Sequence, residues 1–212
     1  GSALSFNGSS SRVTIANSSS LQLSSGMTLE AWVNPATVSS AWRDVIEKGN
    51  DNYFLMATTT QSSDAGGGGI IGGSYGQVFT TSPLAANTWS FLALTYDGAT
   101  ERLYLNGTQV ASLAHTGAIT SSTSALTLGS DPFYGQFFNG LIDNLRIYNS
   151  ALSAAAVQAD MTTPVSTGPD TTPPSAPGTL TATAVSSAEI DLSWGAATDN
   201  AGIANYQVWR CQ

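Results

Sequence analysis

The sequence has few charged residues, and positive charge is scarcest of all. Only 9% of its 212 residues are Asp, Glu, Lys or Arg, against about a quarter in an average globular domain. Six Lys and Arg residues face 14 Asp and Glu residues, so the net charge is −8. This balance excludes nucleic acid as a partner, because binding to a phosphate backbone requires a basic surface. It is compatible with binding of cations or of neutral polymers.

Cysteine and long apolar runs are also scarce. The one cysteine, Cys211, excludes an internal disulfide framework and a cysteine-rich metal site. No run of about 18 apolar residues occurs, so no membrane insertion is predicted. Ser, Thr, Gly and Ala take the place of the missing charges. That composition is typical of secreted bacterial proteins and adhesins, and it predicts a secreted, extracellular or cell-surface location.

Short apolar runs separated by turn residues fill residues 3–148. Leu29, Ala31 and Val33 alternate with polar or larger residues and are predicted to face a core. An Asn-Gly pair at residues 106–107 predicts a tight hairpin turn. Many short antiparallel strands at regular spacing predict an all-β fold, a sandwich or jelly roll.

Four local features carry further expectations. Strict alternation near the end of the β-rich region places Asp143 on one face with Leu145 and Ile147. The glycine run at residues 66–69 is predicted to form a loop. His115 is predicted to be a surface residue. Ser153 is predicted to cap a helix over the alanine-rich segment that follows it.

Proline and threonine density marks a domain boundary. The segment "TTPVSTGPDTTPPSA", within residues 162–176, is predicted to be a stiff, extended linker. It separates a domain at residues 3–161 from a segment at residues 177–212, where the strand pattern resumes.

Four blocks of sequence carry a resemblance to a known family. They are "LSFNGSSSRVTI", "MTLEAWVNP", "NTWSFLALTYDGATERLYLNGTQV" and "FNGLIDNLRIYNSALSAAAV". Together, and in this order, they resemble a laminin-G-like jelly roll of the concanavalin A type from bacterial secreted proteins. Residues 177–212, with the proline-rich entry before them, are similar to the opening of a fibronectin type III domain. The resemblance implies an all-β protein: a jelly roll followed by a partial fibronectin-like segment.

The resemblance also implies a structural Ca²⁺ where the first strand meets the last. Asp143 matches the family's ligand in the "GLID" block, and Asn7 stands where an Asp is common. Calcium accepts amide and carbonyl oxygens, but fewer carboxylates mean weaker binding. The alternative is that Arg12 or backbone N–H groups neutralise Asp143, because a buried carboxylate needs a partner.

Aromatic residues outside the clear alternation are the candidate ligand-binding groups. A sugar ring can lie on an exposed aromatic face while charged and amide groups bind its hydroxyls. The alternative for each aromatic is ordinary packing. The predicted ligand-binding residues are Trp42, Arg43, Tyr75, Asp131, Phe133, Tyr134 and Gln136.

The sequence shows no catalytic constellation. No strand carries the paired acidic residues that a glycosidase needs, and no nucleophile–base spacing surrounds His115. The predicted function is therefore a non-catalytic carbohydrate-binding or adhesion module of a larger secreted protein, with a polysaccharide or glycan as partner. The alternative is a structural spacer or protein-interaction domain without a sugar site. Residues 177–212 supply too few strands for a closed sandwich. They are expected to pair with a second copy of the chain or with the remainder of their own domain.

Overall fold

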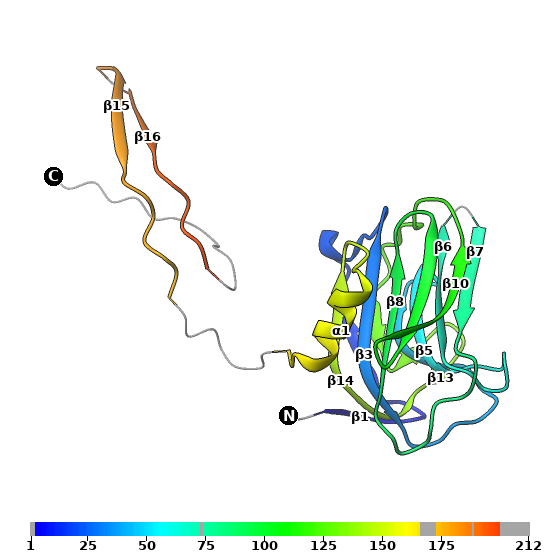
Figure 1. Ribbon diagram of the computed structural model, residues 1–212. Coiled ribbons are helices and arrows are strands. Elements are labelled where there is room, and N and C mark those ends of the chain that lie inside the picture. Colours follow the sequence, from blue (N-terminus) through cyan, green and yellow to red (C-terminus); the bar gives the residue numbers. More distant parts are fainter. Residues whose placement is uncertain (1–2, 73, 166–172, 188, 200–212) are drawn as a thin grey trace. The chain divides into compact units, whose positions relative to one another are not determined.

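A computed structural model describes residues 3–72, 74–165, 173–187 and 189–199 of the chain. The chain divides into two compact units, residues 1–165 and 166–212 (Figure 1). The division falls inside the segment predicted to be a linker. None of the helices in the described part of the chain has the length and apolar character that a membrane span requires.

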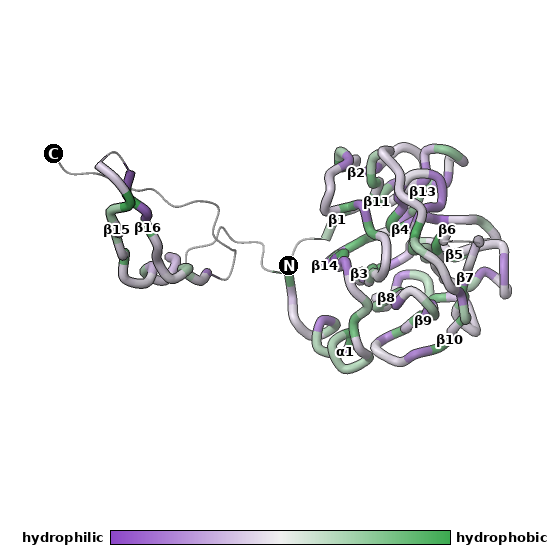
Figure 2. Tube along the Cα trace, turned by 90° about the horizontal axis from the view of Figure 1, so that it is seen from above, coloured by the Kyte–Doolittle hydropathy of each residue, from purple (hydrophilic) through white to green (hydrophobic). Residues whose placement is uncertain are grey.

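The first unit is a sandwich of two antiparallel six-stranded sheets, here called the first and the second sheet (Figures 1 and 2). The first sheet has the order β1 (Leu4–Asn7), β14 (Asn139–Tyr148), β3 (Met27–Pro35), β8 (Ser90–Tyr96), β9 (Thr100–Leu105), β10 (Thr108–Ala114). The second has the order β2 (Val13–Ile15), β11 (Leu126–Leu128), β4 (Arg43–Lys48), β5 (Tyr53–Thr58), β6 (Gly67–Gly72), β7 (Ser74–Phe79). The remaining elements of this unit are η1 (Ser19–Leu21), β12 (Ser130–Asp131), β13 (Gln136–Phe137) and α1 (Ala154–Thr162). The predicted all-β sandwich is confirmed.

The core lies between the two sheets and follows the predicted alternation. Leu29, Ala31 and Val33 of β3 are completely buried in it, opposite residues such as Ile46 and Leu55 of the second sheet. Burial of an aliphatic side chain of this size contributes about 1.5–3 kcal/mol. The residues that alternate with these core positions face outward. On β3 they include the acidic Glu30 and the aromatic Trp32.

Helix α1 covers part of the outer face of the first sheet (Figure 1). Its N-terminus is capped as predicted, since the Ser153 hydroxyl accepts a hydrogen bond from the Ala156 N–H at 3.2 Å. Val157 is completely buried against Phe91 and Tyr104. The Trp32 Nε1 donates to the carbonyl of Met161 at 3.1 Å. A second, smaller apolar cluster therefore fixes the helix to the sheet.

Glu30 lies on this same outer face and is completely buried. Burial first, and then the nearby negative charge of Asp160 on α1, raise its pKa to about 8. The folded state therefore binds a proton that the unfolded chain releases near pH 4.5. The contribution of Glu30 to stability is complete below that pH and is lost as the pH rises through about 8.

We therefore expect the melting temperature at constant calcium to fall between pH 6 and pH 9, and the Glu30→Gln variant to lose part of this slope. Circular dichroism melts of both proteins test the expectation. An identical pH slope in the variant would show that Glu30 does not titrate in this range.

A β-bulge corrects the predicted face of Asp143. The register shifts between Asp143 and Arg146, and Asn144 has a φ of +48°. Ile142 is buried in the core, yet Leu145 and Ile147 also pack against it. Strict alternation cannot place residues 142, 145 and 147 on one face, but a bulge can, because it adds one residue to the strand. The expectation that Asp143 shares a face with Leu145 and Ile147 was therefore wrong.

The sequence predicted a loop for the glycine run at residues 66–69, and for residues 67–69 this prediction was wrong. Gly67, Gly68 and Gly69 belong to β6, between β5 and β7. A Cβ atom on Gly69 would lie 2.1 Å from the carbonyl oxygen of Gly76 and 2.8 Å from the ring of Phe54. The neighbouring strands approach too closely to leave room for a side chain at this position, and only glycine can occupy it without a clash.

His115 is buried, with 6% of its surface exposed, and the prediction of a surface histidine was wrong. Its Nδ1 lies 2.5 Å from Glu101 Oε1, and its Nε2 lies 3.0 Å from the carbonyl oxygen of Ser74. Glu101 belongs to β9 and Ser74 to β7. The imidazole therefore joins the two sheets.

In the second unit, the described residues form a hairpin of β15 (Thr181–Ser186) and β16 (Glu189–Ser193). The strand pattern predicted for this segment is present there. Residues 200–212, which include Cys211, lie outside the described residues. The pairing of this segment with another chain or fragment stays a prediction.

Candidate functional site

The candidate site lies on the outer face of the second sheet, where β4 and β5 form a hairpin. Glu47 and Phe54 are directly opposite each other on these strands, as are Asp44 and Met56. Val45 and Ile46 both face the core, and the register shifts between Asp44 and Ile46. This bulge lets Asp44 and Glu47 share the outer face although they are three residues apart.

Aromatic rings continue this face across the glycine strand. Phe54 is paired with Gly69, and Gly69 with Gln77 of β7. Tyr75 lies two residues from Gln77 on the same face, and its ring stacks on that of Phe54 with centroids 6.0 Å apart. Tyr75 accepts a hydrogen bond from Gln77 Nε2 at 2.6 Å and is 50% exposed. Because Gly69 has no side chain, the two rings can meet over the middle of the strand.

A cavity of about 180 Å³ opens on this face. Four of the seven predicted ligand-binding residues line it, although they come from three separate parts of the chain. Tyr134, between β12 and β13, is 59% exposed. The full lining is Trp42, Asp44, Asp51, Phe54, Met56, Tyr75, Tyr134 and Gln136.

The other three predicted residues lie beside the cavity. Asp131 is buried and accepts a hydrogen bond from the Phe133 N–H at 2.7 Å. Arg43 Nη1 donates to the carbonyl of Phe137 at 3.1 Å, which ties β4 to β13. Phe133 is 57% exposed and lines a neighbouring cavity instead.

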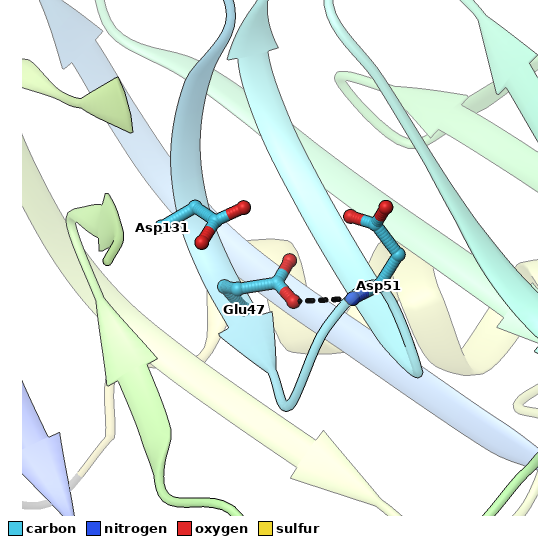
Figure 3. Close-up of side chains that lie close together, drawn as sticks. All are labelled: Glu47, Asp51 and Asp131. Atoms are coloured by element: carbon cyan, nitrogen blue, oxygen red, sulfur yellow. Dashed lines mark hydrogen bonds between the residues drawn. The ribbon is translucent and has the colours of Figure 1, made fainter. Parts of the chain in front are cut away.

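Three carboxylates converge at the tip of the β4–β5 hairpin (Figure 3). One oxygen from each of Glu47, Asp51 and Asp131 lies within 4.8 Å of the others. Glu47 and Asp131 are 1% exposed, and Asp51 is half-buried. Glu47 Oε1 accepts a hydrogen bond from the Asp51 N–H at 2.8 Å, whereas Glu47 Oε2 has no hydrogen-bond partner among the described residues. We call these three residues the acidic cluster.

Burial and mutual repulsion disfavour the charged forms of these groups. Burial, followed by the charge of Asp44, raises the pKa of Glu47 to about 10. Burial and the neighbouring Asp131 raise the pKa of Asp51, and burial raises that of Asp131. The buried Asp44 likewise has a pKa well above its usual value. A cation placed here would reverse this balance, because an opposite charge favours the ionised carboxylates.

The acidic cluster fits a hard divalent cation. Ca²⁺ binds carboxylate and carbonyl oxygens at about 2.3–2.6 Å, so two oxygens on one ion lie at most about 5 Å apart. The 4.8 Å limit on the three oxygens meets this condition. The unpartnered, buried Glu47 Oε2 is the group that most needs such a partner.

Asn7 and Asp143, the calcium ligands expected from the sequence, are not brought together. Asn7 is opposite Asn139, four residues from Asp143 along β14, which places the two about 13 Å apart. The Asn7 Oδ1 already accepts hydrogen bonds from three backbone N–H groups, those of residues 9–11. Asp143 accepts one from the Asn144 N–H at 2.8 Å. This hydrogen bond agrees with the alternative that backbone N–H groups, and not a calcium ion, interact with the Asp143 carboxylate.

Sequence reasoning missed Asp44, Glu47 and Asp51. One feature could have found them: these three of the chain's 14 acidic residues lie within one stretch of eight residues. Their convergence with Asp131, some 80 positions later, was not readable because it depends on β12 and β13 packing beside β4.

The sequence model of the concanavalin A-like lectin/glucanases superfamily matches residues 7–158. Among characterised proteins, Chitinase A1 of Niallia circulans is 31% identical over 149 residues, which cover 65% of this chain. The chain spans 8% and 20% of the length of the chitinases that it matches.

Solved structures share the fold. Domain 4 of AbnA, a GH43 extracellular arabinanase from Geobacillus stearothermophilus, was solved in complex with arabinotriose. It has a TM-score of 0.59 and 23% identity, with coverage of 75% of this chain and 76% of that domain. The CBM40 of the Ruminococcus gnavus IT-sialidase, bound to α2,3-sialyllactose, has a TM-score of 0.55 and 15% identity, with coverage of 74% and 95%. At these identities the likeness establishes the fold.

Proposed function

Because the chain belongs to the concanavalin A-like lectin/glucanases superfamily, we propose that residues 3–161 are a non-catalytic carbohydrate-binding module of a larger secreted protein. The module would hold that protein on a polysaccharide or a cell-surface glycan. The observation that carries the proposal is the cavity on the second sheet, where exposed aromatic rings and polar groups converge.

The chemistry of the cavity suits a neutral sugar. The exposed rings of Tyr75 and Tyr134 offer apolar faces on which the C–H groups of a pyranose or furanose can pack. Asp51 and Gln136 line the same cavity and can accept or donate hydrogen bonds to hydroxyl groups. Two neighbours of the same fold were solved with arabinotriose and sialyllactose bound, which supports a sugar ligand.

A binding role agrees better with the burial of the acids than a hydrolytic role does. A glycosidase places two carboxyl groups on either side of the scissile bond. Glu47 and Asp131 are 1% exposed and do not line the cavity, so they are poorly placed to contact a glycosidic oxygen. These two buried acids are better suited to hold a cation.

We assign a structural Ca²⁺ to the acidic cluster. Glu47, Asp51 and Asp131 would hold the ion, and the bound ion would neutralise carboxylates that otherwise repel one another. Asp51 belongs to both the cluster and the cavity lining. The ion would therefore fix the position of one wall of the sugar site.

The second unit fits the opening of a fibronectin type III domain. Its β15–β16 hairpin exposes Ile190 and Leu192, which share one face of β16, an apolar surface that the second sheet of such a sandwich would cover. The proposed extracellular location is supported by the composition and by the likeness to a domain of an extracellular arabinanase.

The Tyr134→Ala variant tests the binding site. We expect it to weaken binding to a neutral polysaccharide tenfold or more, about 1.4 kcal/mol, without lowering the melting temperature, because the ring is largely exposed. Affinity electrophoresis against arabinan, xylan, chitin and starch, followed by calorimetry on the best ligand, measures the effect.

Trp89→Ala is the matched control, since it removes an exposed ring just before β8 of the first sheet. Equal losses in both variants would argue against this cavity. Absence of binding to every glycan, together with a captured protein ligand, would favour the spacer or protein-interaction alternative.

A further inference from the structure

The loop between β12 and β13 separates the sugar-site cavity from a second cavity. The loop begins at Pro132 and ends at Gly135. Tyr134 lines the sugar-site cavity, whereas its neighbour Phe133 lines the second one. The second cavity has a volume of about 290 Å³ and is lined by Arg12, Thr14, Gly49, Ser124, Ala125, Thr127, Pro132 and Phe133.

Both cavities open on the same face of the second sheet. Thr127 is paired with Thr14 on one side and with Glu47 on the other, and Glu47 is paired with Phe54. Paired residues project to the same face, so this row crosses from the second cavity to the first. Thr127 and Phe54 are two strands apart, a separation of about 10 Å.

The second cavity offers the same kind of chemistry as the first. Phe133 presents a ring that is 57% exposed, and the Thr14 hydroxyl and Arg12 guanidinium are polar groups in the same lining. The ion pairs within residues 3–72 and 74–165 are Arg102–Asp97 and His115–Glu101. The Arg12 guanidinium therefore forms no ion pair with a carboxylate among the described residues.

We propose that the second cavity is a subsite for the same glycan chain, which crosses the β12–β13 loop with one sugar packed on Tyr134 and a later one on Phe133. This inference rests on the proposed function. The ligand is then an internal stretch of a neutral polysaccharide rather than a terminal sugar.

The test is the dependence of affinity on chain length. Arabino-, xylo-, cello- and chito-oligosaccharides, from disaccharide to hexasaccharide, are titrated into the calcium-loaded protein by calorimetry. We expect the affinity of the wild-type protein for the preferred series to rise tenfold or more with length. In Phe133→Ala and Arg12→Ala most of this rise is lost, while melting temperatures stay unchanged. Tyr134→Ala weakens binding at every length, and Leu113→Ala, an exposed apolar residue on β10, is the control.

Two failures are distinguishable. If oligosaccharides bind but Phe133→Ala and Arg12→Ala keep the wild-type length dependence, the subsite is overturned and the sugar-binding function stands. If neither the oligosaccharides nor their parent polysaccharides bind, the proposed function fails and the subsite fails with it.

Discussion

Removal of calcium is expected to lower the melting temperature of the sandwich by roughly 5–10 °C at neutral pH. A site filled at about 100 times its dissociation constant adds about 2.7 kcal/mol to stability, and each kcal/mol shifts the midpoint of a domain of this size by about 2–4 °C. The physical origin is the acidic cluster, where Glu47 and Asp131 are almost completely buried close to Asp51. Differential scanning calorimetry in calcium and in excess chelator measures the shift.

The calcium effect is also expected to grow with pH. Without the ion, burial holds the pKa of Glu47 near 10, so the folded state keeps its proton and loses stability as the pH rises. With the ion, the carboxylates are ionised and paired, and binding releases protons. The difference between the two melting temperatures should therefore be larger at pH 8 than at pH 5.5.

Two variants distinguish the possible ligand sets. Asp131→Asn should abolish the response to calcium and chelator, whereas Asp143→Ala should keep it, because Asp143 lies on the other sheet. The reverse result would indicate that calcium binds where the first and last strands meet, as the family resemblance implies. No response in the wild-type protein would contradict a calcium site in the acidic cluster.

Gly69→Ala is expected to destabilise the sandwich by about 3 kcal/mol, the upper end of the usual cost of overpacking. The added Cβ would lie 2.1 Å from the Gly76 carbonyl oxygen, so β6 or β7 must move. The same Cβ would meet the Phe54 ring at 2.8 Å, which disturbs the stack of Phe54 and Tyr75 in the proposed sugar site. Chemical denaturation measures the loss, and sugar affinity should fall with it.

Gly66→Ala is the matched control from the same glycine run. Its Cβ would come no closer than 3.2 Å to a neighbouring atom, the carbonyl oxygen of Ala57. We expect a loss below about 1 kcal/mol there. Equal stability of the two variants would mean that β6 has room for side chains, and that glycine is not required for packing.

The sequence by itself determined the layers of the sandwich. Alternation in β3 identified the buried face, because a strand places every second side chain on the same side. The Asn-Gly pair at residues 106–107 located the turn between β9 and β10, and Ser153 located the start of α1. The aromatic residues Trp42, Tyr75 and Tyr134, which lie outside the clear alternation, line one cavity.

Only the tertiary structure decided which acids meet and which faces the bulged strands present. The bulges near Val45 and Asn144 each add one residue, which reverses the alternation beyond them and cannot be read from a pattern of period two. Glycines 67–69 form a strand because they pair with β5 and β7, and they have no side chains because atoms of neighbouring strands occupy the space that these would need. His115 is buried where its imidazole contacts the Glu101 carboxylate of β9. Asp131 lies close to Glu47 only because β12 packs beside β4. These outcomes depend on contacts between residues far apart in the chain, which local sequence does not encode.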